Sequence, residues 1–303
     1  MEETVAPEPG PDEVLVAVHA AAITFDELRW DETWSHLPST PSHEWSGVIA
    51  ALGGSASSTS GLTVGDEVFG MVAFDRDGAA AEYVVVPSEL VAPKPVSLTH
   101  VEAAALPLAG LTAQQALVDH GGVGPGDDVL VIGAAGGVGA FAVQLALRLG
   151  ARVTATTFAK DHEYVAALGA HRIHTPDEPH RAPLATGSYD VVLDTVGGLG
   201  MRDAMAFARP GGTYISLQEP APADRAAELG VTATFFVVTP ERESLRQLAS
   251  EVDSGQLRVT VAAAYPLIEG RAAFESGSGP RRAPGKTVLV VRDRTYTSDD
   301  VRD

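Results

Sequence analysis

The stretch from Asp127 to Gly150, DDVLVIGAAGGVGAFAVQLALRLG, constrains the fold of this chain more than any other. It opens with a continuous apolar run, Val129 to Ile132, which is typical of a parallel strand covered on both faces. Glycines follow at positions 133, 136, 137 and 139, and apolar residues then recur at every fourth position until Gly150. A buried strand that enters a helix through glycines directs bare N–H groups and the positive helix end at one point. The stretch therefore predicts a site for the pyrophosphate of a dinucleotide.

Two other interpretations of this stretch are a membrane-spanning helix and a core helix without a ligand. Its strict pattern is Ala134-x-Gly136-x-x-Gly139, with alanine where the dinucleotide fingerprint has its first glycine. A membrane span would need a steadier apolar helix than one with four glycines in seven residues and a glutamine at position 144. A core helix without a ligand fits the stretch taken alone, so its surroundings must decide.

Length and composition bound the possible functions. A chain of 303 residues with 45% hydrophobic content can fill two domains with real cores. It has no cysteine, which excludes disulfides, thiolate nucleophiles and cysteine-ligated zinc. A formal charge of −19 disfavours nucleic acid and anionic membranes as partners. The first residues, MEETVAPEPGPDEV, have neither the basic nor the apolar region of a signal peptide, so we expect a cytoplasmic protein.

The region before the glycine turn is predicted to be rich in β-structure. Alternating apolar residues and turn residues predict short strands at 14–20, 46–52, 64–71, 81–86 and 90–92. The loop from Thr24 to Thr40 lies between the first two of them and contains Trp30 and Trp34 among charged residues. Tryptophans in such a loop either fill a core or line a pocket, and the sequence leaves both possibilities open.

The region after the glycine turn continues as alternating strands and helices. Strands are predicted at 151–156, 171–174, 189–194, 212–217 and 231–238, which indicates a doubly wound parallel sheet. An acidic residue at the end of the second strand would bind the ribose of NAD and repel the 2′-phosphate of NADP. This chain has Thr157 and Lys160 there, which favours NADP(H), although a lysine at an exposed strand end is also compatible with plain solvation.

Seven segments in order carry a family resemblance. They are PEPGPDEVLVAVHAAAITFDEL, PSHEWSGVIAALG, LTVGDEVFGM, AAEYVVVP, AAALPLAGLTAQQAL, VLVIGAAGGVGAFAVQLA and YDVVLDTVGG. Together they resemble the medium-chain dehydrogenase/reductase superfamily, and most of all its zinc-free quinone oxidoreductase and zeta-crystallin branch. The resemblance implies a GroES-like β-barrel catalytic domain formed by residues 1–107 and 260–303, and a Rossmann domain formed by residues 108–259. Relatives begin with one or two extra strands, which leaves open whether this barrel lacks its first strands.

The resemblance also implies where the site residues lie. It places catalytic residues at Thr24, Trp30 and Trp34, with Thr24 where zinc-using cousins have cysteine and quinone reductases often have asparagine. The predicted cofactor-binding residues are Thr112, Ala135, Gly136, Gly137, Val138, Gly139, Thr157, Lys160, Thr195, Val196, Leu217, Phe236 and Val238. The segment YPLIEGRAAFESG is similar to the family's closing helix, and the strand 232–238 is expected to join two copies into a homodimer.

The chemistry follows from what the sequence contains and lacks. His43-Glu44 matches the His-Glu pair of the zinc-using cousins, but without cysteine we expect no metal. The sequence shows no strong proton donor. We therefore predict an NADPH-dependent, zinc-independent oxidoreductase that transfers hydride to a small molecule, a quinone or another electron-poor alkene (enone). The alternatives are an enoyl reductase that tailors a secondary metabolite such as a polyketide, and a non-catalytic, crystallin-like protein that binds NADP.

Overall fold

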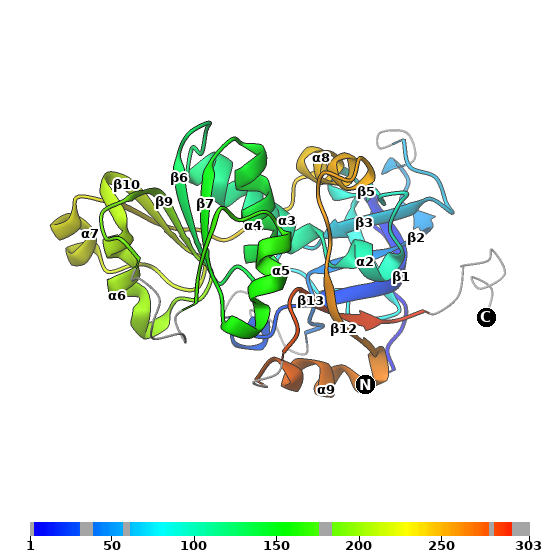
Figure 1. Cartoon of the computed structure of the whole chain (residues 1–303). Coiled ribbons are helices and arrows are strands. Elements are labelled where there is room, and N and C mark those ends of the chain that lie inside the picture. Colours follow the sequence, from blue (N-terminus) through cyan, green and yellow to red (C-terminus); the bar gives the residue numbers. More distant parts are fainter. Residues whose placement is uncertain (1–2, 31–38, 57–60, 176–183, 279–281, 293–303) are drawn as a thin grey trace. The chain divides into compact units, whose positions relative to one another are not determined.

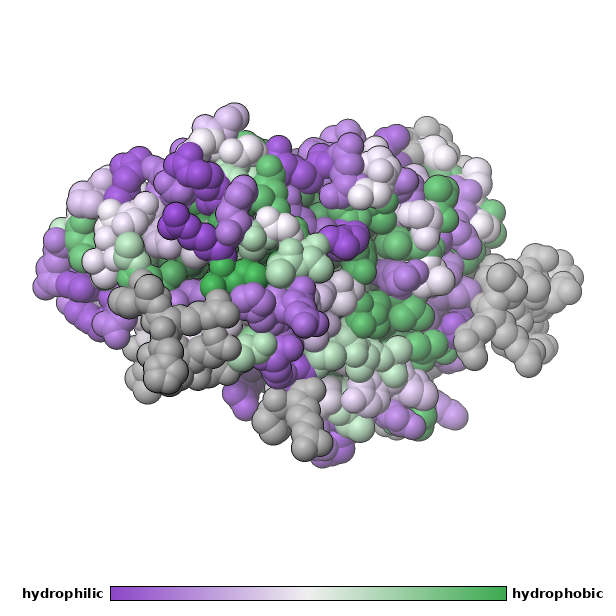
Figure 2. All heavy atoms as spheres, viewed as in Figure 1, coloured by the Kyte–Doolittle hydropathy of each residue, from purple (hydrophilic) through white to green (hydrophobic). Residues whose placement is uncertain are grey.

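The computed structural model describes residues 3–30, 39–56, 61–175, 184–278 and 282–292. The chain divides into two compact units, which we describe separately (Figure 1). The first unit comprises residues 1–111 and 239–303, and the second comprises residues 112–238. Hydrophilic and hydrophobic residues are mixed on the faces of both units that Figure 2 shows. Within the described ranges, no helix has the length and apolar character that a membrane crossing needs.

The first unit is built on a seven-stranded sheet. Its strands are β1 (Glu13–Ile23), β2 (Glu44–Leu52), β3 (Glu67–Met71), β4 (Tyr83–Pro87), β5 (Ala92–Pro93), β12 (Val261–Pro266) and β13 (Lys286–Val290). The order is β12-β13-β1-β2-β3-β5, and β4 also pairs with β1. All pairs are antiparallel except β12 with β13. This β-rich unit agrees with the predicted GroES-like domain.

The long strand β1 is the centre of this unit because both of its faces are covered. Val14, Val16 and Val18 pack in one apolar cluster with the buried Trp45. Ala20 and Ala22 belong to another cluster with the alanines of helix α2 (His100–Ala104). Small side chains let a helix approach a strand closely, so the alanine run near the end of β1 provides the place where α2 packs.

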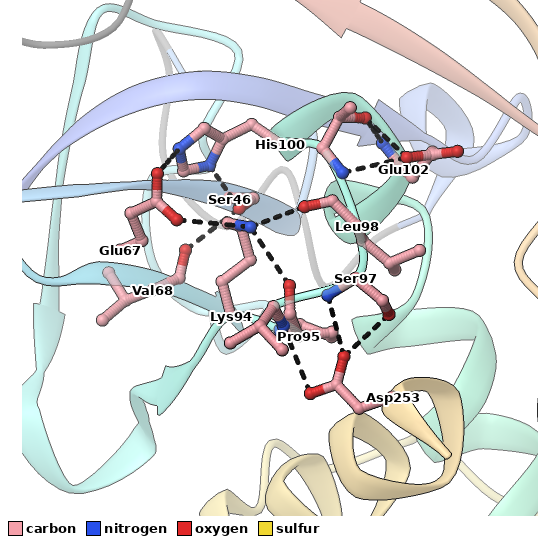
Figure 3. A network of polar contacts seen from close by, with 12 residues as sticks. Ser46, Glu67, Val68, Lys94, Pro95, Ser97, Leu98, His100, Glu102 and Asp253 are labelled. Atoms are coloured by element: carbon pink, nitrogen blue, oxygen red, sulfur yellow. Dashed lines mark hydrogen bonds and ion pairs between the residues drawn. The ribbon is translucent and has the colours of Figure 1, made fainter. Parts of the chain in front are cut away.

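Other helices lie wholly or partly in the first unit, and two of them lie next to its boundaries with the second unit. They are α3 (Pro107–Gln114, which crosses the boundary), α8 (Arg242–Asp253) and α9 (Gly270–Glu275). Asp253 at the end of α8 accepts hydrogen bonds from the backbone N–H groups of Val96 and Ser97 at 3.2 and 2.9 Å (Figure 3). Helix α8 therefore groups with the first compact unit, residues 1–111 and 239–303, whereas the resemblance implied a catalytic domain of residues 1–107 and 260–303.

The second unit contains a six-stranded parallel sheet. Its strands are β6 (Asp128–Ile132), β7 (Arg152–Thr156), β8 (Arg172–His174), β9 (Tyr189–Asp194), β10 (Ala208–Ser216) and β11 (Thr232–Phe235). The order β11-β10-β9-β6-β7-β8 is that of a doubly wound dinucleotide-binding sheet, in which the strand order reverses between β6 and β9. The helices are α4 (Gly137–Arg148), α5 (His162–Ala167), α6 (Met201–Ala204) and α7 (Ala223–Leu229). The predicted Rossmann fold is confirmed.

Two predicted elements differ from the structure. Strand β11 ends at Phe235 rather than at Val238, because the ring of Phe236 leaves the sheet and stacks on His120 with 4.2 Å between the ring centroids. Tyr265 and Pro266 belong to strand β12 and not to the closing helix, which begins only at Gly270. Pairing of β12 with β13 involves residues distant in sequence, and no local pattern shows it.

A stacked pair of histidines, the buried His19 and the half-buried His100, lies where α2 meets the sheet of the first unit. The rings of His19 and His100 stack with 4.3 Å between their centroids. His100 Nδ1 lies 2.8 Å from Ser46 Oγ, and its Nε2 lies 3.6 Å from Glu67, which also pairs with Lys94 at 3.3 Å (Figure 3). Burial lowers the pKa of His100 to about 4 and also lowers the pKa of His19. Both imidazoles are therefore neutral in the folded protein near pH 7.

These shifts predict a loss of stability in mild acid. Between the ordinary histidine pKa of 6.5 and about 4, the unfolded chain binds protons that folded His100 does not. Within that window, the free energy of unfolding should decrease as the pH is lowered. The slope should be at most about 1.4 kcal/mol per pH unit for each histidine whose pKa is lowered. Urea unfolding from pH 7 to pH 4.5 measures the slope, and His100→Asn should reduce it. Equal slopes for parent and variant would contradict the prediction. Glu67, Lys94 and Arg292 are the charged groups that influence this pair.

Candidate functional site

The glycine turn between β6 and α4 is shaped by two glycines with structural roles. Gly133 has φ +82°, in the left-handed region that favours glycine. A Cβ on Gly139 would lie 2.3 Å from the carbonyl oxygen of Gly133, so only glycine lets the helix pack onto the turn. Gly136 is different, because the nearest atom to its Cβ position is 3.3 Å away. The N–H of Gly136 donates to the carbonyl oxygen of Gly133 at 3.0 Å, so the N–H groups available to an anion are those of the first turn of α4, which begins at Gly137.

The other predicted residues around this turn take distinct positions. Ala135, Gly136, Gly137 and Val138 are half-buried, whereas Gly139 is buried. Thr195 donates from Oγ1 to the carbonyl oxygen of Ile132 at 2.8 Å, which ties the end of β9 to the end of β6. Val196 is exposed beside it and Leu217 is half-buried at the end of β10. The ends of β6, β9 and β10 therefore bring most of the predicted dinucleotide residues to the C-terminal edge of one sheet.

Sequence reasoning missed Asp194, which organises this edge. Its Oδ1 accepts the backbone N–H groups of Val196 and Gly197 at 2.9 Å each. Its Oδ2 accepts the phenolic hydroxyl of buried Tyr214 at 2.6 Å, and burial together with this bond raises the pKa of Tyr214. An aspartate that ends a buried strand just before a Thr-Val-Gly-Gly turn is a signal that could have identified it.

The end of β7 can hold the group that distinguishes NADP from NAD. Thr157 is buried, and among the described residues its Oγ1 has no hydrogen-bond partner. Lys160 follows on the exposed turn, 3.7 Å from the carboxylate of Asp161. A buried hydroxyl without a partner is unfavourable until a ligand atom satisfies it. Together with the N–H groups of the first turn of α4, this hydroxyl shows that the chain's own residues fit a phosphorylated dinucleotide.

The first unit contains a buried cluster of polar residues around Glu44. The Lys286 ammonium forms an ion pair with Glu44 Oε1 at 2.5 Å and donates a hydrogen bond to Thr24 Oγ1 at 3.0 Å. Glu44 Oε2 accepts the backbone N–H of Leu108, in the first turn of α3, at 3.0 Å. Glu27 Oε1 accepts the backbone N–H of Ser42 at 3.1 Å. We call Thr24, Glu27, Ser42, Glu44 and Lys286 the Glu44 cluster.

Burial determines the ionisation of this cluster. Glu27 is fully buried, and this raises its pKa to about 8, so it is protonated at neutral pH. Burial also raises the pKa of Glu44, and the nearby Lys286 ammonium opposes that rise. Because Glu27 carries a proton, Glu44 is the carboxylate that balances the charge of Lys286 within the cluster. Glu27 and Lys286 are two further site residues that sequence reasoning missed.

Of the two tryptophans predicted as site residues, the structure describes one, Trp30. Trp30 packs edge-on against Phe74 with 5.5 Å between ring centroids, and Phe74 contacts His43 at 4.9 Å. Burial lowers the pKa of His43 to about 4, so its ring is neutral. Trp34 lies outside the described residues. In the second unit, Thr112 and Val238 are buried and Phe236 is half-buried.

The residues around His43 and Glu44 do not fit a protein zinc site. The sequence has no cysteine, and Glu44 is already paired with Lys286. Among the described residues, no three histidine or acidic side chains come together as metal ligands would. Zinc sites need three or four such ligands, so this arrangement gives no basis for a metal-assisted step.

Two family models match the chain along most of its length. Residues 10–96 match the alcohol dehydrogenase GroES-like domain, and residues 168–289 match a family described as zinc-binding dehydrogenase. The 2-methylene-furan-3-one reductase of Solanum lycopersicum is 32% identical over 310 residues, which cover 95% of this chain and 74% of that protein. The chain belongs to the medium-chain dehydrogenase/reductase superfamily. Activity as an NAD(P)H oxidoreductase follows from this membership.

Solved structures of the superfamily support the assignment. The quinone oxidoreductase from Coxiella burnetii is 29% identical with a TM-score of 0.85, and the match covers 95% of this chain and 93% of that one. Mycobacterial Rv1454c complexed with NADPH is 28% identical with a TM-score of 0.82, over 96% and 94% of the two chains. The latter agrees with the cofactor that the end of β7 predicts, NADP(H).

Proposed function

We propose that this superfamily member is an NADPH-dependent reductase of quinones or other electron-poor alkenes and that it works without a metal. The observation that carries the proposal is the composition of the Glu44 cluster. Its carboxylate is held by Lys286 and the sequence has no cysteine, so this cluster does not offer zinc the ligands with which it could polarise an isolated carbonyl. A conjugated acceptor has less need of such help, because the charge that hydride brings is spread over several atoms.

In this proposal, residues of the second unit bind the dinucleotide and residues of the first unit contact the acceptor. The N–H groups of the first turn of α4 would hold the pyrophosphate, and Thr157 with Lys160 would bind the 2′-phosphate. When bound, the nicotinamide supplies the hydride. Thr24, with its hydroxyl supported by Lys286, would contact the acceptor, and Trp30 would line its site. Thr195, Val196 and Leu217 would flank the dinucleotide at the sheet edge. The assay that tests the whole proposal compares classes of acceptor and is developed in the Discussion.

Cofactor preference gives a separate prediction. Lys160→Ala should weaken NADPH binding about ten- to a hundredfold and leave NADH binding unaffected, because one charge-assisted contact to phosphate contributes about 1.5 to 3 kcal/mol. Fluorescence titration of both dinucleotides measures this, with Lys94→Ala as the control for loss of a lysine elsewhere. Equal affinities of the parent protein for NADPH and NADH would overturn the assignment of the 2′-phosphate site.

We further propose that two copies join through β11. This strand is at the edge of its sheet; its last residue, Phe235, is 37% exposed, and Val237 just beyond it is 44% exposed. An edge without charged residues would pair uncontrollably unless a two-fold partner covers it. Light scattering at micromolar concentration should give twice the mass of the 31.4 kDa chain, and a monomer would contradict the proposal.

A further inference from the structure

Lys286 makes one more contact than a counterion for Glu44 requires. Its ammonium reaches Glu44 Oε1 at 2.5 Å and Thr24 Oγ1 at 3.0 Å. The side chains of Lys286 and Glu44 are 8% and 1% exposed, whereas Thr24 is only half-buried. The contact with Thr24 therefore connects a buried ammonium to a hydroxyl on the less buried side of the cluster.

The direction of this hydrogen bond determines what the hydroxyl can do. An ammonium has donors only, so Lys286 donates and the Thr24 oxygen accepts. The hydroxyl proton of Thr24 must then point away from Lys286, and no acceptor for it is found among the described residues, so it can donate to a bound molecule. Thr24 can thus give a proton to a bound molecule and receive one from Lys286. Glu27 does not interfere as a second anion, because its raised pKa keeps it protonated.

We propose that Thr24 and Lys286 form a proton relay that completes the reduction of enones. This inference rests on the proposed function. Hydride addition to the β-carbon of an enone forms a C–H bond, and the electron pair of the alkene moves to the α-carbon and the carbonyl oxygen. The α-carbon takes the proton of the Thr24 hydroxyl while Thr24 Oγ1 takes a proton from Lys286. Lys286 is left as a neutral amine and regains its proton from water through Thr24 after the product leaves.

Lys286→Arg is the variant that separates proton donation from charge. Arginine keeps the positive charge that Glu44 requires, but a guanidinium is effectively always protonated and cannot act as an acid. General acid catalysis contributes about 100-fold or more, so the ratio of kcat with an enone to kcat with a quinone should fall about 100-fold. The quinone is less affected, because its reduced anion can be protonated by water after release. KM for the enone should change little.

The configuration of the product at its α-carbon tests the relay directly. If Lys286 and Thr24 had only a structural role, their substitution would leave that configuration unchanged. An enone with a substituent on the α-carbon gains a stereocentre when that carbon is protonated. The parent protein should protonate one face, because the donor is fixed at Thr24. Lys286→Arg and Thr24→Val should give mixtures of both configurations, because water then protonates the enolate. Lys94→Arg is the matched control, since Lys94 is also buried in the first unit but contacts Glu67 and the carbonyl of Leu98 instead.

The outcomes separate the relay from the function on which it rests. A parent protein that reduces neither enones nor quinones would refute the proposed function and the relay together. An active parent whose two variants keep both the kcat ratio and the single product configuration would refute the relay alone. If the Lys286→Arg protein does not fold, the Thr24→Val variant tests the relay, because that substitution removes a hydroxyl group and leaves the buried charges in place.

Discussion

NADPH should be consumed readily with quinones or enones, and at least about 100-fold more slowly with saturated ketones, aldehydes or alcohol oxidation under matched conditions. Reduction of an isolated carbonyl builds charge on one oxygen at once, and enzymes stabilise that charge with a metal or preorganised donors that contribute about 100- to 1000-fold. The Glu44 cluster contains no zinc ligand set, its carboxylate is occupied by Lys286, and the donor that we propose in it, Thr24, protonates the α-carbon and not the carbonyl oxygen. Conjugated acceptors spread the same charge and so need less stabilisation.

The measurement is the decay of NADPH absorbance across these acceptor classes, with and without EDTA. Chelation should not change the rates. Enoyl thioesters belong in the same assay, because an enoyl reductase would prefer them to simple enones. A preference for saturated carbonyls, or loss of activity on chelation, would show that the site works by another chemistry. Absence of turnover with every acceptor would favour the non-catalytic alternative.

Gly136→Val should weaken binding of both dinucleotides by about 100-fold or more while the protein stays folded. Gly136 has φ −72° and ψ 170°, which any residue can adopt, and a Cβ there makes one tight contact, 3.3 Å from the carbonyl oxygen of Gly133, which a shift of a few tenths of an ångström relieves. The valine side chain would instead occupy the space at the start of α4 through which the backbone must approach pyrophosphate. Loss of contact between phosphate and several N–H groups accounts for the size of the effect.

Gly139→Val is the matched control for this prediction. Its Cβ would lie 2.3 Å from the carbonyl oxygen of Gly133, so this variant should lose stability rather than affinity alone. Thermal unfolding and fluorescence titration of both variants separate the two effects. A folded Gly136→Val protein that binds NADPH as the parent does would place the dinucleotide elsewhere.

The dinucleotide half of the site was predictable because its signals are local. The apolar run of β6, the glycine turn and the helical spacing of α4 lie within 24 consecutive residues, and each follows from backbone conformation or short-range packing. The chain itself also shows threonines at the end of β7, Thr156 and Thr157, where an acidic residue would select NAD. The parallel, doubly wound sheet was predictable from the alternation of strands and helices, whereas the order of its strands came from the structure.

Other features depend on contacts between distant parts of the chain. The end of β11 is set by the stacking of Phe236 on His120, and the place of α8 by the bonds from Asp253 to residues 96 and 97. A pattern of hydrophobicity records which residues are buried, but it does not record which partner each one meets. Strand ends and domain boundaries were therefore predicted less well than the elements themselves.

The sequence by itself determined the Rossmann sheet and the glycine turn, because short-range sterics and apolar periodicity specify them, and its seven ordered segments carried the resemblance to the superfamily. Only the tertiary structure revealed the Glu44 cluster. Thr24 and Lys286 are 262 positions apart, and in the sequence Glu27 and Lys286 look like ordinary surface charges. Folding brings Lys286 on β13 and Glu44 on β2 together with Thr24 and Glu27, which follow β1. Burial away from water leaves Glu27 protonated, and Lys286 then pairs with the carboxylate of Glu44. Ionisation and hydrogen bonding in a buried site depend on distances and solvent access, which exist only once the chain is folded.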